Sequence, residues 1–224
     1  MKLHPQAKFI YLITSGQTKP DSTTSSEAFT DILNLIEAAV AAGINLVQIR
    51  EKQLPAKVLY ELTVAAVRIV NGSSTLLLVN DRADIAVGAG AHGVHLTSES
   101  IEAGVIRTTF GPELLIGVST HSLEQASAAQ QQGADFVVLG PIFETSSKLK
   151  YGAPLGLETL RRVSAQLSGF PVLAIGGINS GNALDCVRSG ASGIAAISML
   201  SSPPQLVEIV NEARSSFDEN GIGS

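Results

Sequence analysis

The chain has 224 residues, of which 45% are hydrophobic and 16% charged, so it can bury a large core and is too apolar to be intrinsically disordered. Its 15 Lys and Arg residues against 20 Asp and Glu residues give a net charge of −5, without the concentrated positive charge that a nucleic-acid partner needs. The single cysteine, Cys186, excludes an internal disulfide, and neither a secretion signal nor an apolar run of about 18 residues is evident, so we expect a cytoplasmic protein without a membrane partner.

Eight short runs of Val, Ile and Leu, each bounded by turn residues, predict the strands of a parallel sheet. Both faces of such a sheet are covered, so the strands lose the alternation of apolar and polar residues. Segments with helical period or composition follow each run. In chain order, we predict strands over 9–14, 46–51, 75–81, 93–96, 114–120, 136–142, 171–178 and 193–199. The helices that follow them are predicted over 26–42, 55–70, 82–89, 99–110, 122–132, 156–167, 179–189 and 204–217.

This order of strand and helix, repeated eight times in 224 residues, predicts an α/β fold, a single-domain (β/α)8 TIM barrel over residues 1–224. A doubly wound open sheet is the alternative, since it has the same rhythm. Gly43, Gly133 and Gly190 precede predicted strands, where a left-handed helix C-cap is cheap only for glycine. Because the chemistry of such barrels lies at the C-terminal ends of the strands, polar residues there are the candidates for function.

Two cations and an amide stand at the end of the second predicted strand. Alternation within segment 48–52, QIREK, sends Gln48, Arg50 and Lys52 to one side, toward the mouth of the barrel. The alternative interpretation is a solvated, charged strand end in which Arg50 pairs with Glu51.

The third predicted strand changes abruptly from an aliphatic run to the hydrogen-bonding side chains of Asn80 and Asp81. By itself, Asp81 suits a helix cap, because an Asp at a helix start accepts bonds from exposed amide groups. Next to the cations of the second strand, its carboxylate also suits a magnesium ion that bridges phosphate oxygens.

Phosphate-binding groups are predicted after the last three strands. Two hydroxyls and a lysine follow the sixth strand and suit phosphate oxygens, the alternative being a polar surface loop. Two glycines let backbone N–H groups approach a ligand after the seventh strand, the alternative being a tight turn, and the eighth strand ends nearby. These residues are Thr145, Ser147, Lys148, Gly176, Gly177, Ile197 and Ser198.

One histidine is placed for proton transfer. His121 follows the fifth predicted strand at the mouth of the barrel and could exchange a proton near neutral pH; the alternative is a residue at a helix N-terminus that only hydrogen-bonds a loop. His95 lies inside the fourth predicted strand and is interpreted as a core histidine with both ring nitrogens bonded. The spacing of His, Cys and carboxylates suggests neither a zinc site nor a Ser-His-Asp triad.

Taken together, these segments resemble the thiamine phosphate synthase and thiazole tautomerase superfamily. The segments that carry the resemblance are VQIREK at 47–52, NDRAD at 80–84, GVHL at 93–96, GVSTH at 117–121, GPIF at 140–143 with 145–148, and AIGGI at 174–178. The resemblance implies a transferase that joins hydroxymethylpyrimidine diphosphate to thiazole phosphate, releases diphosphate and uses Mg²⁺. It implies small phosphorylated substrates as partners, and a homodimer is compatible with it.

The resemblance also implies a role for each candidate residue. Gln48 would contact the pyrimidine and Asp81 would bind Mg²⁺, and in the tautomerase branch His121 would be the catalytic histidine. The diphosphate would be held by Arg50, Lys52, Asn80 and Lys148, with Ser119 near it. The thiazole phosphate would be held by Thr145, Ser147, Gly177, Ile197 and Ser198. Loss of diphosphate builds negative charge on the leaving oxygens, so cations there would supply most of the catalysis.

Three positions depart from the synthase pattern and keep other functions open. Ser100 replaces an Asp that would be a second metal contact, and neighbouring Glu99 is the carboxylate that could reach the ion, directly or through water. Ser15 stands where an Asp is common, and Glu144 lies in a segment that looks more like the tautomerases. We therefore expect a synthase, with two alternatives: a metal-free tautomerase that uses His121, or a paralogue that only binds a thiazole or thiamine phosphate.

Overall fold

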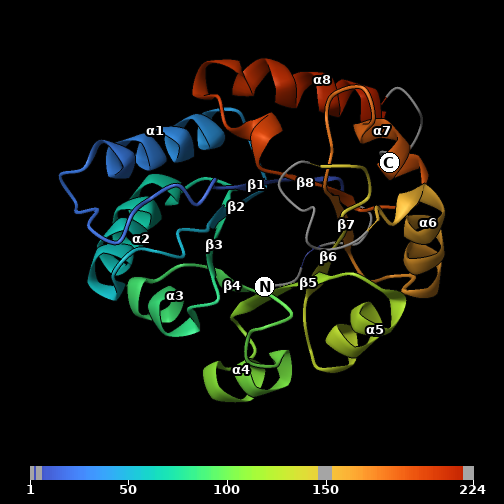
Figure 1. The fold of residues 1–224 in the computed structure, drawn as a ribbon, viewed down its shortest axis with the longest axis horizontal. Coiled ribbons are helices and arrows are strands. Elements are labelled where there is room, and N and C mark those ends of the chain that lie inside the picture. The colour runs from blue at the N-terminus through green and yellow to red at the C-terminus, as the bar shows by residue number, and fades with distance from the viewer. Residues whose placement is uncertain (1–2, 4–6, 146–152, 219–224) are drawn as a thin grey trace.

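The computed structural model describes residues 3, 7–145 and 153–218, which form a closed barrel of eight parallel strands inside a ring of helices (Figure 1). The strands pair in chain order, and β1 pairs with β8, which closes the barrel and rules out the open sheet. The strands are β1 (Phe9–Ile13), β2 (Leu46–Ile49), β3 (Leu76–Asn80), β4 (Gly93–Leu96), β5 (Leu115–Thr120), β6 (Phe136–Leu139), β7 (Val172–Ile175) and β8 (Gly193–Ala196).

The helices follow the strands and lie outside them (Figure 1). They are α1 (Glu27–Ala41), α2 (Ala56–Val70), α3 (Ala83–Ala89), α4 (Ala103–Phe110), α5 (Leu123–Gln131), α6 (Gly156–Gln166), α7 (Ala183–Arg188) and α8 (Leu206–Asp218), with short 3-10 turns η2 (Ser198–Leu200) and η3 (Pro203–Gln205) after β8. Gly43, Gly133 and Gly190 have φ values of 73°, 84° and 94°, as predicted for left-handed helix ends. Among the described residues, no helix has the length and apolarity needed to cross a bilayer.

The core has two layers, because successive residues of a strand point to opposite faces. One side of each strand packs against the helices; Leu12, Val47 and Ile116 belong to this layer. The other side fills the inside of the barrel, where Tyr11, Leu78 and other large side chains meet. Several inward positions near the C-terminal strand ends, among them Gln48, Asn80 and Ser119, are polar instead, and a cavity lies there.

Several predicted elements are longer than the observed ones, and the largest differences lie near the mouth of the barrel. The sixth and eighth strands end at Leu139 and Ala196, and the fourth helix begins at Ala103 instead of residue 99. The hydroxyl of Ser100 accepts a hydrogen bond from Thr97 N at 2.7 Å and closes a turn before that helix. Glu99 therefore lies in the loop after β4.

Candidate active site

A cavity at the mouth of the barrel is lined by residues from seven of the eight strands or the loops that follow them, all except β6. Neighbouring strands deliver these residues side by side, because each contributes the last inward position of its alternation. The lining residues are Ile13, Gln48, Arg50, Lys52, Asn80, His95, Thr97, Ser98, Glu99, Ser119, His121, Ile175 and Ile197. Most of the predicted catalytic residues thus meet in one place.

The amides of Gln48 and Asn80 form the floor of this cavity. Gln48 is 1% exposed and Asn80 9% exposed, and Gln48 Nε2 donates to Asn80 Oδ1 at 3.1 Å. This bond fixes both amide planes, so the remaining amide atoms are presented in a defined orientation. Arg50, half-buried, and Lys52, exposed, stand at the same strand end and bring two positive charges to it.

A chain of hydrogen bonds continues through the barrel from Gln48. The Tyr11 hydroxyl lies 3.4 Å from Gln48 Oε1 and 3.2 Å from His95 Nδ1, and His95 Nε2 lies 2.9 Å from Ser119 Oγ. Both ring nitrogens of His95 are bonded, which confirms its interpretation as a core histidine. Burial raises the pKa of Tyr11 well above its ordinary value, so its hydroxyl stays protonated at neutral pH.

The direction of the Tyr11 hydroxyl proton determines whether Ser119 can donate a hydrogen bond to a ligand. A hydroxyl has one proton, so Tyr11 donates either to Gln48 or to His95. When it donates to His95 Nδ1, the Nε2–H of His95 donates to Ser119, and the Ser119 hydroxyl proton can then bond to an anionic oxygen in the cavity. The direction in which the Ser119 hydroxyl donates is therefore set by Tyr11, which contacts His95, and His95 in turn contacts Ser119.

Glu51 does not pair with Arg50. Its carboxylate is 3% exposed and turns away from the cavity to the loop after β1, where four groups donate to it at 2.6 to 3.2 Å. The donors are the hydroxyls of Thr14 and Thr18 and the N–H groups of Gly16 and Thr18. The interpretation of this strand end as an Arg50–Glu51 ion pair was wrong, because alternation sends the two side chains to opposite faces.

Two carboxylates flank the cavity at neighbouring strand ends. Asp81 is exposed, has a left-handed backbone with φ 63°, and its N–H donates to His95 O at 2.9 Å. It is not the cap of α3, since Arg82 holds that position. Glu99 is exposed and lines the cavity. The described residues contain no cluster of three His, Cys, Asp or Glu that could hold a metal ion by themselves.

His121 lies at the edge of the cavity, after β5. Its Nδ1 is 2.5 Å from Gly140 O, and because a carbonyl only accepts, Nδ1 carries the proton. This bond gives the ring the tautomer in which Nε2 is the basic nitrogen. The prediction that His121 stands at the barrel mouth is confirmed, and the alternative, a hydrogen bond to a loop, also applies.

The predicted phosphate residues are only partly brought together. Ile197 lines the cavity and Ser198 is exposed at the start of η2. A Cβ on Gly177, whose φ is 66°, would lie 2.4 Å from Glu144 O, so this glycine is required by the close approach of the loop after β6. Thr145 is half-buried in that loop, whereas Ser147 and Lys148 lie outside the described residues.

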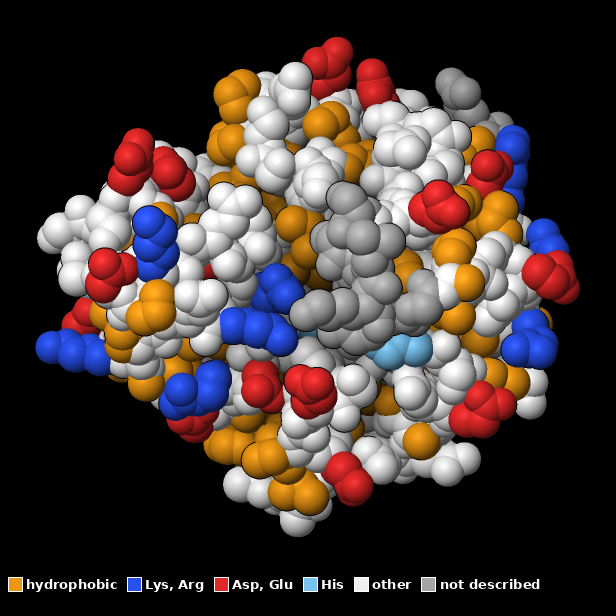
Figure 2. All heavy atoms as spheres, in the orientation of Figure 1, with side chains coloured by type: hydrophobic (Ala, Val, Ile, Leu, Met, Phe, Trp, Pro, Cys, Tyr) orange, Lys and Arg blue, Asp and Glu red, His pale blue; other side chains and the backbone are white. Residues whose placement is uncertain are grey.

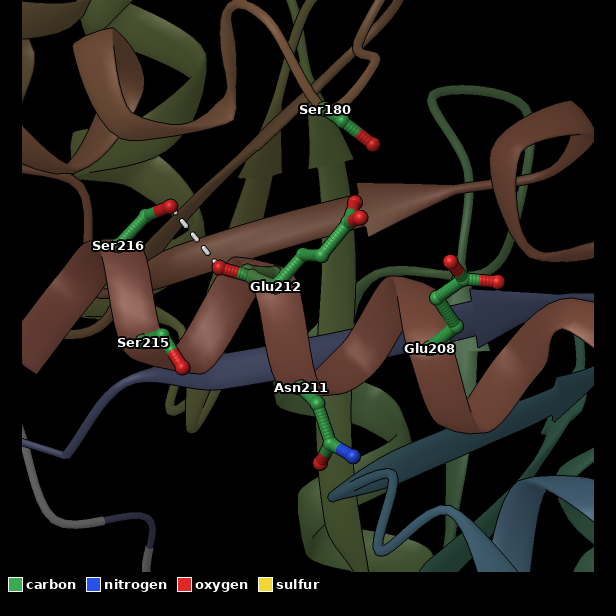
Figure 3. A pocket seen from close by; sticks show the side chains of 7 residues that line it. Ser180, Glu208, Asn211, Glu212, Ser215 and Ser216 are labelled. Atoms are coloured by element: carbon green, nitrogen blue, oxygen red, sulfur yellow. Dashed lines mark hydrogen bonds between the residues drawn. The ribbon is translucent and has the colours of Figure 1, made fainter.

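The charge on the molecular surface supports an anionic ligand here. In Figure 2, Lys and Arg side chains gather near the middle of the face, with Asp and Glu side chains directly below them and a His side chain farther to the right. A different hollow lies outside the barrel along α8, where Glu208 and Glu212 project near Ser180 (Figure 3). Its seven lining residues include two carboxylates and no cation, so it does not suit a phosphorylated substrate.

Comparison with known proteins identifies the family. The family model described as thiamine monophosphate synthase matches residues 10–200. The chain belongs to this family. A putative thiamine-phosphate synthase of Geobacter sulfurreducens is 44% identical over 174 residues, 78% of this chain and 81% of that protein. A thiamine-phosphate synthase of Moorella thermoacetica is 39% identical over 189 residues, 81% of this chain and 90% of that protein.

A solved structure of the same family has the same fold. The thiamine phosphate pyrophosphorylase of Pyrococcus furiosus superimposes with a TM-score of 0.77 at 30% identity, covering 96% of this chain and 97% of that one. The thiamine monophosphate synthase family and the TIM barrel, both expected from the sequence, are confirmed.

Two residues that support the site from behind its lining were not predicted from the sequence. Tyr11 lies in an apolar strand without a polar neighbour in sequence to mark it, and Glu51 entered only the alternative interpretation of its strand end, as an ion-pair partner of Arg50. The alternation that placed Arg50 inside the barrel also places Glu51 outside it, and this was the available indication that Glu51 has another partner.

Proposed function

We propose that this chain is a thiamine-phosphate synthase that joins hydroxymethylpyrimidine diphosphate to thiazole phosphate. The C–O bond between the pyrimidine methylene and the diphosphate breaks, with its electrons leaving on diphosphate, and the thiazole nitrogen forms a new C–N bond to that methylene. The observation that carries the proposal is the cavity in which Arg50 and Lys52 stand beside the Gln48–Asn80 amide pair. The family membership supports the same reaction.

In this reaction the residues bind and orient the substrates and stabilise charge. The amide edge of Gln48 holds the pyrimidine ring, and Arg50 and Lys52, with Asn80 and Lys148, hold the diphosphate. Negative charge grows on the leaving oxygens as the bond breaks, and fixed cations stabilise it more in the transition state than in the bound substrate. Ser119, oriented by His95, donates to a diphosphate oxygen.

The thiazole phosphate lies on the opposite side of the reacting carbon. Its phosphate is held by the strand-end residues of β7 and β8 and the loop after β6, near which Ile175 and Ile197 supply apolar walls. The residues proposed for this phosphate are Thr145, Ser147, Gly177, Ile197 and Ser198.

Asp81 and Glu99 are the residues that would hold a magnesium ion beside the diphosphate. Mg²⁺ commonly takes one or two carboxylates and keeps water and phosphate oxygens as its other ligands, so two exposed carboxylates at adjacent strand ends are a suitable donor set. When bound, the ion would neutralise charge on the leaving diphosphate. Ser100, which replaces the usual Asp, closes the turn at Thr97 and adds no carboxylate.

A thiazole tautomerase is the second candidate function, favoured by His121. Its Nδ1–H bond to Gly140 makes Nε2 the basic nitrogen of a ring at the cavity edge, as a proton-transfer residue requires. That reaction needs neither a diphosphate site nor a metal. The combination of Arg50, Lys52 and Asp81 has no use in it and supports the synthase.

The deciding experiment supplies the purified chain with both substrates, with and without Mg²⁺. We expect thiamine monophosphate and diphosphate in equal amounts, and loss of product in chelator. Isomerisation of a thiazole carboxylate phosphate, abolished by His121→Asn, would establish the tautomerase instead. Binding of thiazole phosphate without any turnover would leave a binding-only paralogue. Sedimentation of the same sample tests the homodimer, and fractionation of cells tests the cytoplasmic location.

A further inference from the structure

The loop after β1 is fastened to the end of β2 by one buried carboxylate. Glu51 Oε1 accepts from the Thr14 hydroxyl at 2.6 Å and Gly16 N at 3.1 Å, and Oε2 accepts from the Thr18 hydroxyl at 2.7 Å and Thr18 N at 3.2 Å. Each oxygen thus holds one end of the segment 14–18. Two hydroxyls and two backbone N–H groups satisfy the carboxylate, which is 3% exposed.

Within the described part of the chain, no Lys, Arg or His forms an ion pair with Glu51. The ion pairs there join other residues, and none includes Glu51 or Arg50. A buried charge without an ion-pair partner is costly unless its hydrogen bonds are complete. Four hydrogen bonds to Glu51 therefore hold this loop, beside the bonds that join Thr14 to Gln48 O and Arg50 N.

The fastened loop packs directly against Arg50. A Cβ on Gly16, where φ is 74°, would lie 3.0 Å from Arg50 Nη1 and 3.0 Å from Arg50 O, so the backbone of Gly16 lies against the arginine at both ends. Thr14 Oγ1, which donates to Glu51, also accepts from Arg50 N at 2.8 Å. The same carboxylate thus fixes the wall beside the guanidinium and, through Thr14, the backbone that carries it.

We propose that Glu51 is a positioning residue for Arg50, and that it sets the affinity for the diphosphate group without touching it. An arginine side chain has many rotamers, and a fixed wall reduces the entropy that it loses when it binds an anion. Releasing the loop would let Gly16 move away from the guanidinium. This inference rests on the proposed function, in which Arg50 holds the diphosphate.

The main variant is Glu51→Gln, which keeps the shape of the side chain and removes one acceptor oxygen. Its NH₂ would face a backbone N–H, which cannot accept, and a threonine hydroxyl, which would have to turn to accept, so at least one of the four bonds is lost and a second is reversed. We expect the Kd for inorganic diphosphate, measured by calorimetry in the presence of Mg²⁺, to rise about tenfold, the factor that corresponds to about 1.4 kcal/mol. In steady-state kinetics the KM for the pyrimidine diphosphate should rise, while that for the thiazole phosphate stays within about twofold.

Asp135→Asn is the matched structural control. Asp135 lies just before β6, where its carboxylate accepts from Ile116 N at 2.8 Å and from Arg107 Nη2 at 2.7 Å. It resembles Glu51 in accepting backbone and side-chain donors, and it lies at the opposite end of a strand from the cavity. Its replacement should lower the melting temperature and leave the diphosphate Kd unchanged.

A pair of variants at Thr18 tests the same loop if Glu51→Gln fails to fold. Thr18→Val removes one hydroxyl donor to Glu51 Oε2, and Thr18→Ser keeps it. We expect weaker diphosphate binding for the valine variant and near-normal binding for the serine variant. Equal affinities in the two variants would contradict the proposal.

The variant Arg50→Ala separates a failure of the positioning role of Glu51 from a failure of the proposed role of Arg50 in diphosphate binding. If Arg50→Ala weakens diphosphate binding and Glu51→Gln adds less than about twofold to it, the two residues act through one interaction, as proposed. If Arg50→Ala weakens binding and Glu51→Gln alone does not, or if Asp135→Asn weakens binding as much, the positioning role is wrong and the proposed function stands. If Arg50→Ala binds diphosphate normally, the assignment of Arg50 fails and the role of Glu51 fails with it.

Discussion

Single residues inside the barrel are constrained by what touches them across it. Gly117 is an example: a Cβ there would lie 2.3 Å from Phe136 Cζ and 2.8 Å from His95 Nδ1. The rings of Tyr11, His95 and Phe136 meet in pairs with centroids 5.7 to 6.0 Å apart, and Gly117 leaves room for them. A side chain at this position would therefore disturb both packing and the bond from His95 to Ser119.

We predict that Gly117→Ala lowers the free energy of unfolding by about 1–3 kcal/mol, the usual cost of overpacking a core. Gly104→Ala in α4 is the control, because its Cβ would meet Gln132 O at 3.6 Å, an ordinary contact, and alanine favours a helix by up to about 1 kcal/mol. Urea unfolding of both variants checks this. Equal free energies of unfolding for the two variants would mean that the rings of Tyr11, His95 and Phe136 can move to accommodate the added methyl group.

A second prediction at this scale concerns Ser100. Its hydroxyl accepts from Thr97 N, and an aspartate could keep that bond with one oxygen and offer the other to a metal. Ser100→Asp should lower the Mg²⁺ concentration for half-maximal synthase activity several-fold, whereas Ser98→Asp, with the same charge in the same loop, should change it less. An unchanged Mg²⁺ requirement in Ser100→Asp would place the metal elsewhere.

At the scale of elements, one histidine joins two strands. His92 lies just before β4, and its Nδ1 accepts from Leu77 N of β3 at 3.0 Å. Burial lowers the pKa of His92 below its ordinary value of 6.5. Unfolded His92 therefore binds a proton at a higher pH than folded His92, and the protonated ring loses this acceptor.

The consequence is a loss of stability in acid. His92 contributes fully above pH 6.5, and that contribution disappears as the pH falls from 6.5 through the lower pKa of the folded state. His92→Asn keeps an acceptor for Leu77 N and does not titrate. We predict that the variant loses less stability than the original chain between pH 7.5 and 5, as followed by thermal unfolding. If the variant and the original chain lose the same stability between pH 7.5 and 5, His92 is not the cause of the loss in acid.

At the scale of the whole molecule, the closed barrel protects its single thiol. Cys186 in α7 is 0% exposed within the layer between barrel and helices. Burial, with a smaller effect of Asp185, raises its pKa to about 12. The thiol is therefore neutral and inaccessible in the folded protein, and thiolate is the reactive form.

We predict that a thiol reagent labels Cys186 only when the barrel opens. At pH 8 the native protein should react orders of magnitude more slowly than the protein in urea, with a rate that follows unfolding. Cys186→Ala provides the blank. Rapid labelling of the native protein, at the rate of a free thiol, would show that α7 detaches separately from the barrel.

The order of elements, the barrel and most of the strand-end residues follow from the sequence alone. Buried parallel strands appear in the sequence as apolar runs, and alternation tells which side of a strand a residue faces, so Gln48, Arg50 and Lys52 were placed at the mouth, whereas Ser119 was assigned to the site through the resemblance. Only the tertiary structure decided which partners they meet. Glu51 binds a loop more than thirty residues earlier in the chain, and Tyr11 meets His95 across the barrel, 84 residues away. The periodicity of the sequence shows to which side of a strand a side chain points. A hydrogen bond also requires that two atoms lie at a particular distance, and closure of the barrel brings these atoms together.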